Sequence, residues 1–181
     1  MTSGLRIAQT EELEDADVAA ISALCSIAFD EAWDDAWEEV GPGVHVFVPG
    51  TGDVLAHAMI VDRGLYLGHE PDLALDVGYV EWVATRPDRQ GEGHGTTVMR
   101  EIGRIIGDEY ALGALATSSN AFYERLGWQT WQGPTYVRMA DGQRVRSAGE
   151  DGHVMVLRTP RTPELDLGGP IAVDWRAEEP W

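Results

Sequence analysis

The sequence Gln90-Gly91-Glu92-Gly93-His94-Gly95 decides how this chain of 181 residues is interpreted, because of the segments on either side of it. An apolar, strand-like run (75–85, LDVGYVEWVAT) precedes it, and a helix-like run (96–107) follows. A strand, a glycine-rich turn and a helix N-terminus form an anion-binding arrangement, because the unpaired backbone N–H groups and the helix dipole favour negative charge. The alternative is an ordinary glycine-rich turn. The stretch favours binding of a compound that carries phosphates.

Two common nucleotide-binding motifs do not fit this stretch. A P-loop ends in Lys followed by Ser or Thr, whereas this loop ends in Gly95-Thr96-Thr97. A dinucleotide fingerprint needs a third glycine where Thr96 stands, and it usually opens the first βαβ unit, whereas about half of this chain comes earlier. Another phosphate-containing ligand is therefore expected.

Composition predicts one globular domain (1–181) in a reduced, cytoplasmic compartment. The hydrophobic content of 44% is ordinary, and no apolar run has the length of a membrane span or a signal peptide core. The single cysteine, Cys25, has apolar neighbours at helical spacing, which indicates a core residue and not a nucleophile. No metal site is expected, because the five histidines are scattered at positions 45, 57, 69, 94 and 153.

The charge is strongly acidic, with 31 acidic and 13 basic residues and a formal net charge of −18. Such a surface repels nucleic acid and anionic lipid and attracts cationic ligands. A generic acidic surface that keeps the protein soluble is the alternative. One segment, 30–39, holds six acids and two tryptophans, so it could face a cation.

Local patterns predict both helices and strands. The periodicity predicts helices at 15–29, 96–107 and 120–126, and the alternation predicts strands at 5–9, 44–48, 54–61, 75–85, 111–117, 128–139 and 153–158. Residues 64–74 and 140–152 are expected to form loops, and residues after 160 an irregular tail.

Two residues, Glu81 and Tyr123, are candidates for a catalytic role. In the strand 75–85, alternation puts Tyr79, Glu81, Val83 and Thr85 on one face, so that Glu81 is a carboxylate in an apolar run. It could pair with an arginine, but an acid beside a phosphate-binding loop favours a functional role. Tyr123 lies on the predicted helix 120–126, either as a packed side chain or as a proton donor.

These motifs resemble the GCN5-related N-acetyltransferase (GNAT) superfamily. Gln90, Gly93 and Gly95 match its signature Q/R-x-x-G-x-G/A, and 120–128 (NAFYERLGW) is similar to its Asn-Ala-Phe-Tyr pattern before Gly and an aromatic residue. From about residue 56 onward, the fragments GYVE, LGAL, GPT and DWRA, with the final Trp181, resemble the aminoglycoside 2'-N-acetyltransferases. The resemblance implies an α+β GNAT fold, with a mostly antiparallel sheet flanked by helices and a splayed strand pair that binds acetyl-CoA.

The resemblance also assigns expected roles. Acetyl-CoA would be the co-substrate, an aminoglycoside the cationic acceptor, and a homodimer a possible assembly. Glu81 would be the base and Tyr123 the acid of a direct acetyl transfer. The residues expected to bind acetyl-CoA are Val83, Ala84, Thr85, Gln90, Gly91, Glu92, Gly93, His94, Gly95 and Thr96. Those expected to contact the acceptor are Glu31, Asp34, Asp35, Glu81, Trp82, Thr117, Glu150, Asp151, Glu178, Glu179 and Trp181.

The residue types suit this chemistry. Several carboxylates bind a polycation through charge-assisted hydrogen bonds, but they also keep its amines protonated, so a base is needed. A strand N–H would stabilise the oxyanion of the transferring acetyl group. Two departures from the family stand out: Trp82 replaces a small glycine, and Glu179 replaces an aspartate.

Three other functions remain open from the sequence. The chain could be a GNAT enzyme that acts on another cationic amine, such as a polyamine, a peptide or a lysine. It could be a protein that binds acyl-CoA or sequesters an antibiotic without turnover, although Glu81 and Tyr123 argue against that. An acidic interaction protein without a ligand would leave the glycine loop unexplained.

Overall fold

The computed structural model describes residues 4–30, 33, 36–69, 72–177 and 179–181. Contacts divide the chain into two compact units, the first from residues 1–61 and 80–104 and the second from 62–79 and 105–181. The divisions fall inside three elements, β3 (Val54–Leu67), β4 (Leu73–Thr85) and α3 (His94–Glu109). Each unit is described below by itself.

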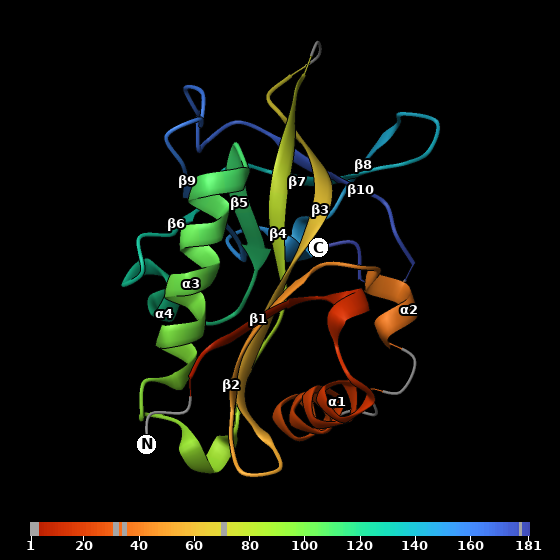
Figure 1. Cartoon of the computed structure of the whole chain (residues 1–181). Coiled ribbons are helices and arrows are strands. Elements are labelled where there is room, and N and C mark those ends of the chain that lie inside the picture. The colour runs from red at the N-terminus through yellow and green to blue at the C-terminus, as the bar shows by residue number, and fades with distance from the viewer. Residues whose placement is uncertain (1–3, 31–32, 34–35, 70–71, 178) are drawn as a thin grey trace. The chain divides into compact units, whose positions relative to one another are not determined.

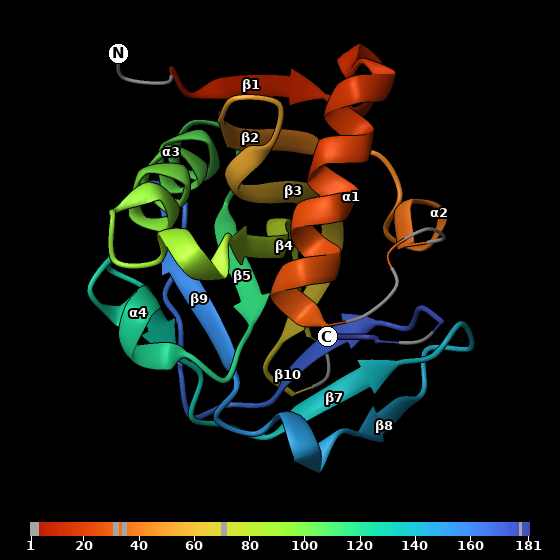
Figure 2. The same ribbon diagram turned by 90° about the horizontal axis from the view of Figure 1, so that it is seen from below.

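The first unit is built on antiparallel strands and one long helix. Strand β1 (Arg6–Gln9) pairs with β2 (Val44–Pro49), and β2 pairs with β3, with His45 opposite Met59 and Phe47 opposite His57. Helix α1 (Asp15–Phe29) runs across these strands (Figure 2) and buries Ile21, Leu24 and Cys25. The unit also contains η1 (Thr10–Glu12), α2 (Ala36–Val40), η2 (Pro87–Arg89), the end of β4 and the start of α3.

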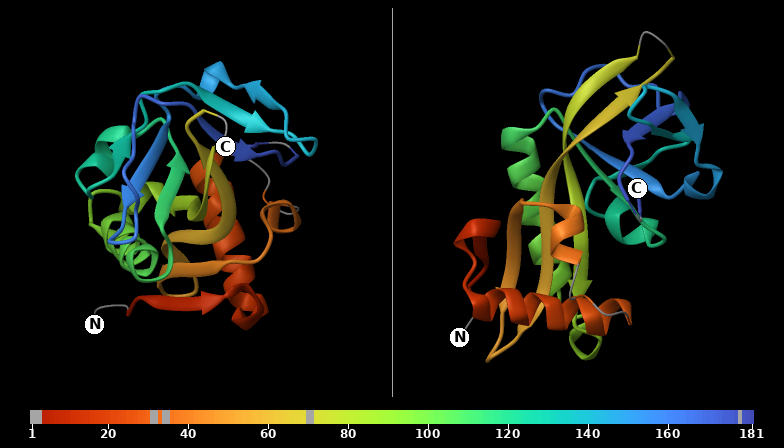
Figure 3. Two further views of the ribbon diagram at one scale, coloured as in Figure 1. Left: turned by 90° about the horizontal axis from the view of Figure 1, so that it is seen from above. Right: turned by 90° about the vertical axis from the view of Figure 1, so that its right-hand side faces the viewer.

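The second unit contains the other strands. One run of neighbouring strands consists of β6 (Gln129–Thr130), β9 (Val154–Arg158) and β5 (Leu112–Ala116), followed by residues 73–79 of β4. A second run consists of residues 62–67 of β3, β10 (Ile171–Asp174), β7 (Thr135–Arg138) and β8 (Arg144–Arg146). Strands β10, β7 and β8 lie side by side (Figures 1 and 3). The pairs β4–β5 and β10–β7 are parallel, whereas the other described pairings are antiparallel. Helices α4 (Asn120–Glu124) and η3 (Ala148–Glu150) complete this unit.

The fold class and most of the predicted elements are confirmed. The sheet is mixed and mostly antiparallel among its described pairings, and helices flank it, as expected for the α+β class. Cys25 is fully buried, and burial raises the pKa of its thiol to about 12, so it is a core residue as predicted. The expectation of a single domain stays a prediction. Among the described residues, no helix combines the length and the apolar character needed to cross a membrane.

Three segments expected to be irregular contain strands instead. Most of 64–74 belongs to β3 and β4, the loop 140–152 contains β8 and η3, and the tail after residue 160 contains β10. Polar residues and glycines in these segments suggested loops, but strand pairing orders them: β8 pairs with the nearby β7, whereas the end of β3 and β10 pair with distant parts of the chain. Strand β10, for example, pairs with both β3 and β7.

Arg63, directly before this segment, illustrates why β3 continues beyond the predicted strand 54–61. This polar residue lies within β3, where its guanidinium donates hydrogen bonds to the carbonyls of Pro180 (2.6 Å) and Asp174 (2.7 Å) and lies 4.9 Å from the centre of the Tyr79 ring. A polar side chain with such partners is compatible with a half-buried strand. Local sequence does not reveal partners more than a hundred positions away.

Candidate active site

The glycine loop has the backbone geometry that its sequence predicts. Gly91 and Gly93 have φ angles of +83° and +88°, which glycine adopts without strain. Helix α3 begins at His94, two residues earlier than predicted, so His94, Gly95 and Thr96 form its first turn. The N–H of Thr97 already donates to the Gly93 carbonyl (3.0 Å), which starts the helical ladder. The N–H groups of residues 94–96 therefore lie at the helix terminus, where an anion is favoured.

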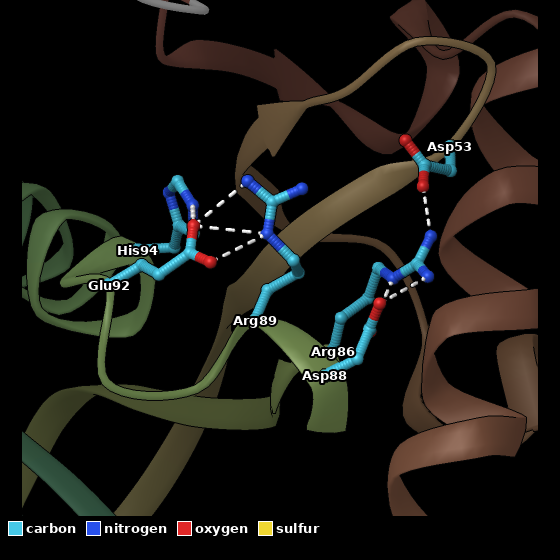
Figure 4. A network of polar contacts seen from close by, with 6 residues as sticks. All are labelled: Asp53, Arg86, Asp88, Arg89, Glu92 and His94. Carbon is cyan, nitrogen blue, oxygen red and sulfur yellow. Dashed lines mark hydrogen bonds and ion pairs between the residues drawn. The ribbon is translucent and has the colours of Figure 1, made fainter.

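Charged side chains surround this loop in two clusters (Figure 4). The Arg86 guanidinium lies between the carboxylates of Asp53 and Asp88, whereas the Glu92 carboxylate accepts hydrogen bonds from Arg89 (2.8 Å) and lies 3.2 Å from Nε2 of His94. The hydrogen bond from Arg89 lowers the pKa of Glu92, so Glu92 is an anion within the predicted phosphate loop. Arg89 is the nearest cation in sequence that could exchange this partner for a phosphate.

The last residues of β4 alternate in exposure along the two faces predicted from the sequence. Val80, Trp82 and Ala84 are buried, whereas Glu81, Val83 and Thr85 are partly exposed. The alternation did not predict the backbone at Trp82, which has a φ of +52°. A non-glycine residue in the left-handed region is strained, and such strain often occurs at functional sites. Trp82 occupies the position where the resembled family has glycine, the residue that this conformation favours.

Aromatic rings pack around the Trp82 side chain. The rings of Trp33 and Trp37 meet it edge-on, with centroids 5.7 and 4.9 Å away. Phe29, at the end of α1, stacks on Trp33 at 4.9 Å, and Trp37 stacks on His45 at 5.2 Å. The two tryptophans noted in the acidic segment 30–39 thus belong to an aromatic cluster around β4.

A chain of hydrogen bonds reaches the backbone of Trp82 from the core. The Trp82 carbonyl lies 3.0 Å from Nδ1 of His57, whose Nε2 lies 2.9 Å from Nδ1 of His45. Nε2 of His45 lies 3.0 Å from the hydroxyl of Thr10. Both histidines are fully buried, and burial lowers the pKa of His45 to about 4 and that of His57 to about 3, the latter also because His45 is close. Both rings are therefore neutral at pH 7.

Tyr123 lies in α4 of the second unit, with 6% of its surface exposed. Burial raises the pKa of its phenol to about 12, although a hydrogen bond with the Thr117 side chain acts in the opposite direction. Tyr123 is consequently a neutral hydrogen-bond donor throughout the physiological pH range. Thr117, a predicted acceptor contact, thus interacts with the predicted acid.

The predicted acidic contacts differ in their surroundings. Glu31, Asp34, Asp35 and Glu178 lie outside the described residues. Asp151 is engaged within the protein, because its carboxylate pairs with Arg146 and accepts the N–H (3.1 Å) and hydroxyl (2.9 Å) of Thr135, which lowers its pKa to about 2. Glu150 ends η3 and is partly exposed, and Glu179 is exposed.

Trp181 is buried despite being the last residue of the sequence. Only 7% of its surface is exposed, and its indole N–H donates to the Ser147 hydroxyl (3.0 Å). Together with the hydrogen bond from Arg63 to the Pro180 carbonyl, this contact fixes the end of the chain within the second unit. The specific chain-end pattern in the sequence thus corresponds to a packed segment.

Sequence reasoning missed the two buried histidines, which it described as scattered. The signal lies in the register of the predicted hairpin, since His57 pairs with Phe47 and His45 with Met59, which makes the histidines diagonal neighbours. The described residues include no group of three or more His, Cys, Asp or Glu that could hold an ion.

Comparison with known proteins identifies the family. The sequence model of the acetyltransferase (GNAT) domain matches residues 9–131. An aminoglycoside 2'-N-acetyltransferase from Mycolicibacterium fortuitum is 35% identical over 180 residues, which cover 97% of this chain and 91% of that protein. The chain therefore belongs to the GNAT family of N-acetyltransferases.

Solved structures share the fold at low sequence identity. A GNAT family acetyltransferase from Brucella melitensis, solved in complex with acetyl-CoA, has a TM-score of 0.57 at 17% identity and covers 94% of this chain and 96% of its own. A GCN5-related N-acetyltransferase from Kribbella flavida has a TM-score of 0.54 at 20% identity over 74% of this chain, which spans 34% of that longer protein. These likenesses concern the fold alone.

Proposed function

We propose that this protein transfers the acetyl group of acetyl-CoA to an amine of an aminoglycoside, at the 2' position. The observation that carries the proposal is the relative from Mycolicibacterium fortuitum, which matches nearly the whole chain at 35% identity and is itself an aminoglycoside 2'-N-acetyltransferase. A resistance phenotype and a homodimer, both suggested by resemblance, are part of the same proposal.

Acetyl-CoA would bind at the glycine loop and along β4. The positive φ angles of Gly91 and Gly93 and the N-terminus of α3 support a pyrophosphate site formed by residues 90–96. Val83, Ala84 and Thr85 would pair with the pantetheine through their backbone, and the Val83 N–H would donate to the acetyl oxygen as negative charge develops there. The Brucella melitensis relative with bound acetyl-CoA supports the same co-substrate.

Glu81 would act as the base. It is partly exposed on β4 and directly precedes Trp82 and Val83, so it belongs to the strand that would present the thioester. Carboxylates that attract a polycation also keep its amines protonated, so transfer requires removal of a proton, directly or through water. The neutral amine then attacks the acetyl carbonyl, and the thiolate of CoA leaves.

Tyr123 would donate a hydrogen bond to the departing sulfur. Its pKa of about 12 keeps the phenol protonated, so the donor is present whenever the thiolate forms. The raised pKa favours stabilisation of the thiolate by a hydrogen bond over complete proton transfer, because a thiol is a stronger acid, with an unperturbed pKa of about 8.5. The thiolate could then take its proton from water.

The acceptor would be held by carboxylates. The net charge of −18 attracts a polycation over long distances, and Glu150 and Glu179 are accessible acids in the second unit. Asp151 is a weaker candidate, because Arg146 and Thr135 already engage its oxygens. The acids at 31, 34, 35 and 178 remain candidates from sequence alone, as does the C-terminal Trp181.

The proposal is tested by measuring release of the CoA thiol with aminoglycosides, polyamines and a lysine-containing peptide as acceptors. We expect turnover with aminoglycosides. Glu81→Gln should lower kcat by about 10²- to 10⁴-fold, because it removes the base without changing the shape of the side chain. Binding of acetyl-CoA, measured by calorimetry, should not change.

Glu109→Gln is a matched control, because Glu109 is exposed at the end of α3. It should leave kcat at the wild-type value. Turnover with polyamines or the peptide alone would assign a different acceptor, and full turnover by Glu81→Gln would remove Glu81 from the role of base.

A further inference from the structure

The hydrogen bonds from Thr10 to Trp82 have one direction when both histidines are neutral. A carbonyl only accepts, so Nδ1 of His57 carries the proton and donates to the Trp82 oxygen (3.0 Å). Nε2 of His57 is then an acceptor and receives the proton of His45 Nδ1 (2.9 Å). Nε2 of His45 is then an acceptor that faces the Thr10 hydroxyl (3.0 Å), whose proton is shared between this nitrogen and the Gly43 carbonyl (3.1 Å) and whose oxygen accepts the Gly43 N–H (2.9 Å). The Trp82 carbonyl thus fixes the tautomer of both rings.

The hydrogen bond from His57 to the Trp82 carbonyl determines the direction of the Val83 N–H. Trp82 C=O and Val83 N–H belong to one peptide group, and in a planar trans peptide these two bonds point in opposite directions. Because His57 binds the carbonyl from the buried side, the Val83 N–H is directed away from His57. The proposed function assigns this N–H to the acetyl oxygen.

We propose that His57 is a positioning residue for acetyl transfer: supported by His45 and Thr10, it orients the Trp82–Val83 peptide so that the Val83 N–H faces the reacting carbonyl. The inference rests on the proposed function, because it concerns the same donor. His57 touches neither substrate nor co-substrate in this account and acts through the backbone.

The conformation of Trp82 explains why such a support is needed. A φ of +52° is unfavourable for any residue with a Cβ atom, so the peptide would relax without external restraint. The contacts among the described residues include the packing of Trp33 and Trp37 against the Trp82 side chain and the hydrogen bond from His57 to the Trp82 carbonyl. The hydrogen bond acts directly on the peptide that carries the Val83 N–H.

Two amide substitutions separate positioning from general support of the core. His57→Asn places an amide N–H near the position of Nδ1 and keeps the bond to Trp82. His57→Gln places its amide oxygen near the position of Nε2, where it accepts from His45 Nδ1, and leaves no donor near Nδ1. His57→Leu removes both bonds. The readouts are kcat and KM for thiol release, with the melting temperature as a record of folding.

We expect His57→Leu and His57→Gln to lower kcat by about 10- to 100-fold, approaching the loss seen when an oxyanion donor is removed, with little change in the KM of the acceptor. His57→Asn should restore most of kcat. If Asn and Gln have equal kcat values, or if Leu keeps the wild-type kcat, the positioning role is wrong. If Leu does not fold, the comparison of Asn with Gln still decides.

A second measurement does not depend on activity. Nitrogen-15 NMR of the ligand-free protein at pH 7 should show a neutral His57 with its proton on Nδ1. A proton on Nε2, or a charged ring, would overturn the inference even if acetyl transfer is confirmed. Conversely, an Nδ1–H tautomer in a protein that acetylates no amine would contradict the proposed function and leave the structural link between His57 and Trp82 intact.

Discussion

His45 and His57 are the residues whose chemistry is most strongly set by the fold. Each is fully buried, each has one nitrogen that donates and one that accepts, and neither can gain a proton without reversing a hydrogen bond. In the sequence they are two isolated histidines in apolar strands. Their pairing depends on the register between β2 and β3, which the sequence indicates only through the predicted hairpin.

Stability should decrease on mild acidification because of these two residues. Above the unperturbed pKa of about 6.5, both rings are neutral in the folded and in the unfolded chain. As the pH falls below that value, the unfolded chain takes up protons, whereas the folded chain does not until pH values near the folded pKa values of about 4 and 3. Stability is thus fully present above pH 6.5 and is lost as the pH falls toward those values.

Urea denaturation at pH 7 and pH 5 measures this effect. At 1.36 kcal/mol per pH unit, His57 alone should account for a loss of roughly 2 kcal/mol at pH 5. His57→Asn should show a smaller loss between the two pH values. His153→Gln, at an exposed position, should behave as the wild type. An unchanged free energy of unfolding between pH 7 and pH 5 would show that the pair is not buried in its neutral form.

At the scale of the element, β4 combines a predicted pattern with an unpredicted distortion. The alternation in 75–85 separated Trp82 and Ala84, which are buried, from Glu81 and Val83, which are partly exposed. Alternation describes regular strands, however, and it contains no information about a local reversal of φ. The one available signal was that the resembled family has glycine at the position of Trp82, because glycine is the residue that adopts a positive φ without strain.

A pair of substitutions at Trp82 separates the strain from the packing. Trp82→Ala and Trp82→Gly both lose the aromatic contacts, at about 3–5 kcal/mol for a buried Trp, so both should be less stable than the wild type. Glycine removes the strain that alanine keeps, so Trp82→Gly should be more stable than Trp82→Ala by about 1 kcal/mol. Elsewhere in a strand glycine is the less stable of the two. If urea denaturation shows that Trp82→Ala is as stable as Trp82→Gly or more stable, the positive φ at position 82 is contradicted.

The glycine loop and α3 form the second element whose function can be tested alone. Gly93→Ala introduces a Cβ atom at φ +88°, which should distort the loop and weaken acetyl-CoA binding by about 10-fold or more, equivalent to at least 1.4 kcal/mol. Gly107→Ala, in α3, is the control, because its φ is not positive and a Cβ atom there meets no other atom within 4 Å. Calorimetry should show wild-type affinity for the control, and equal affinities for both variants would separate the loop from co-substrate binding.

For the whole molecule, the sequence allowed prediction of the elements with local signatures. The helices 15–29 and 120–126, the hairpin at 44–61 and the glycine loop follow from periodicity, turns and glycine positions. It did not allow prediction of β10 or the extension of β3, because these depend on pairing between distant segments. It also missed β8, a short strand that pairs with the neighbouring β7. The candidate site follows the same division: the glycine loop and Glu81 have local signals, whereas the histidine pair and the aromatic cluster depend on tertiary contacts.

The acidic charge and the family membership together indicate the class of acceptor that the protein uses. A protein with a net charge of −18 that belongs to the GNAT family is suited to a polycationic amine, and its 35% identical relative narrows the class to aminoglycosides. Acetylation of the 2' amine can be tested with two aminoglycosides that differ only in the group at that position.

The most direct measurement compares two aminoglycosides that are identical except for an amine or a hydroxyl at the 2' position. Purified protein is incubated with acetyl-CoA and each compound, thiol release is followed, and the product is analysed by mass spectrometry and NMR. The account predicts thiol release and a single acetyl group on the 2' nitrogen for the amine, and no turnover for the hydroxyl compound. Equal turnover of both compounds, acetylation at another amine, or no turnover of either would contradict it.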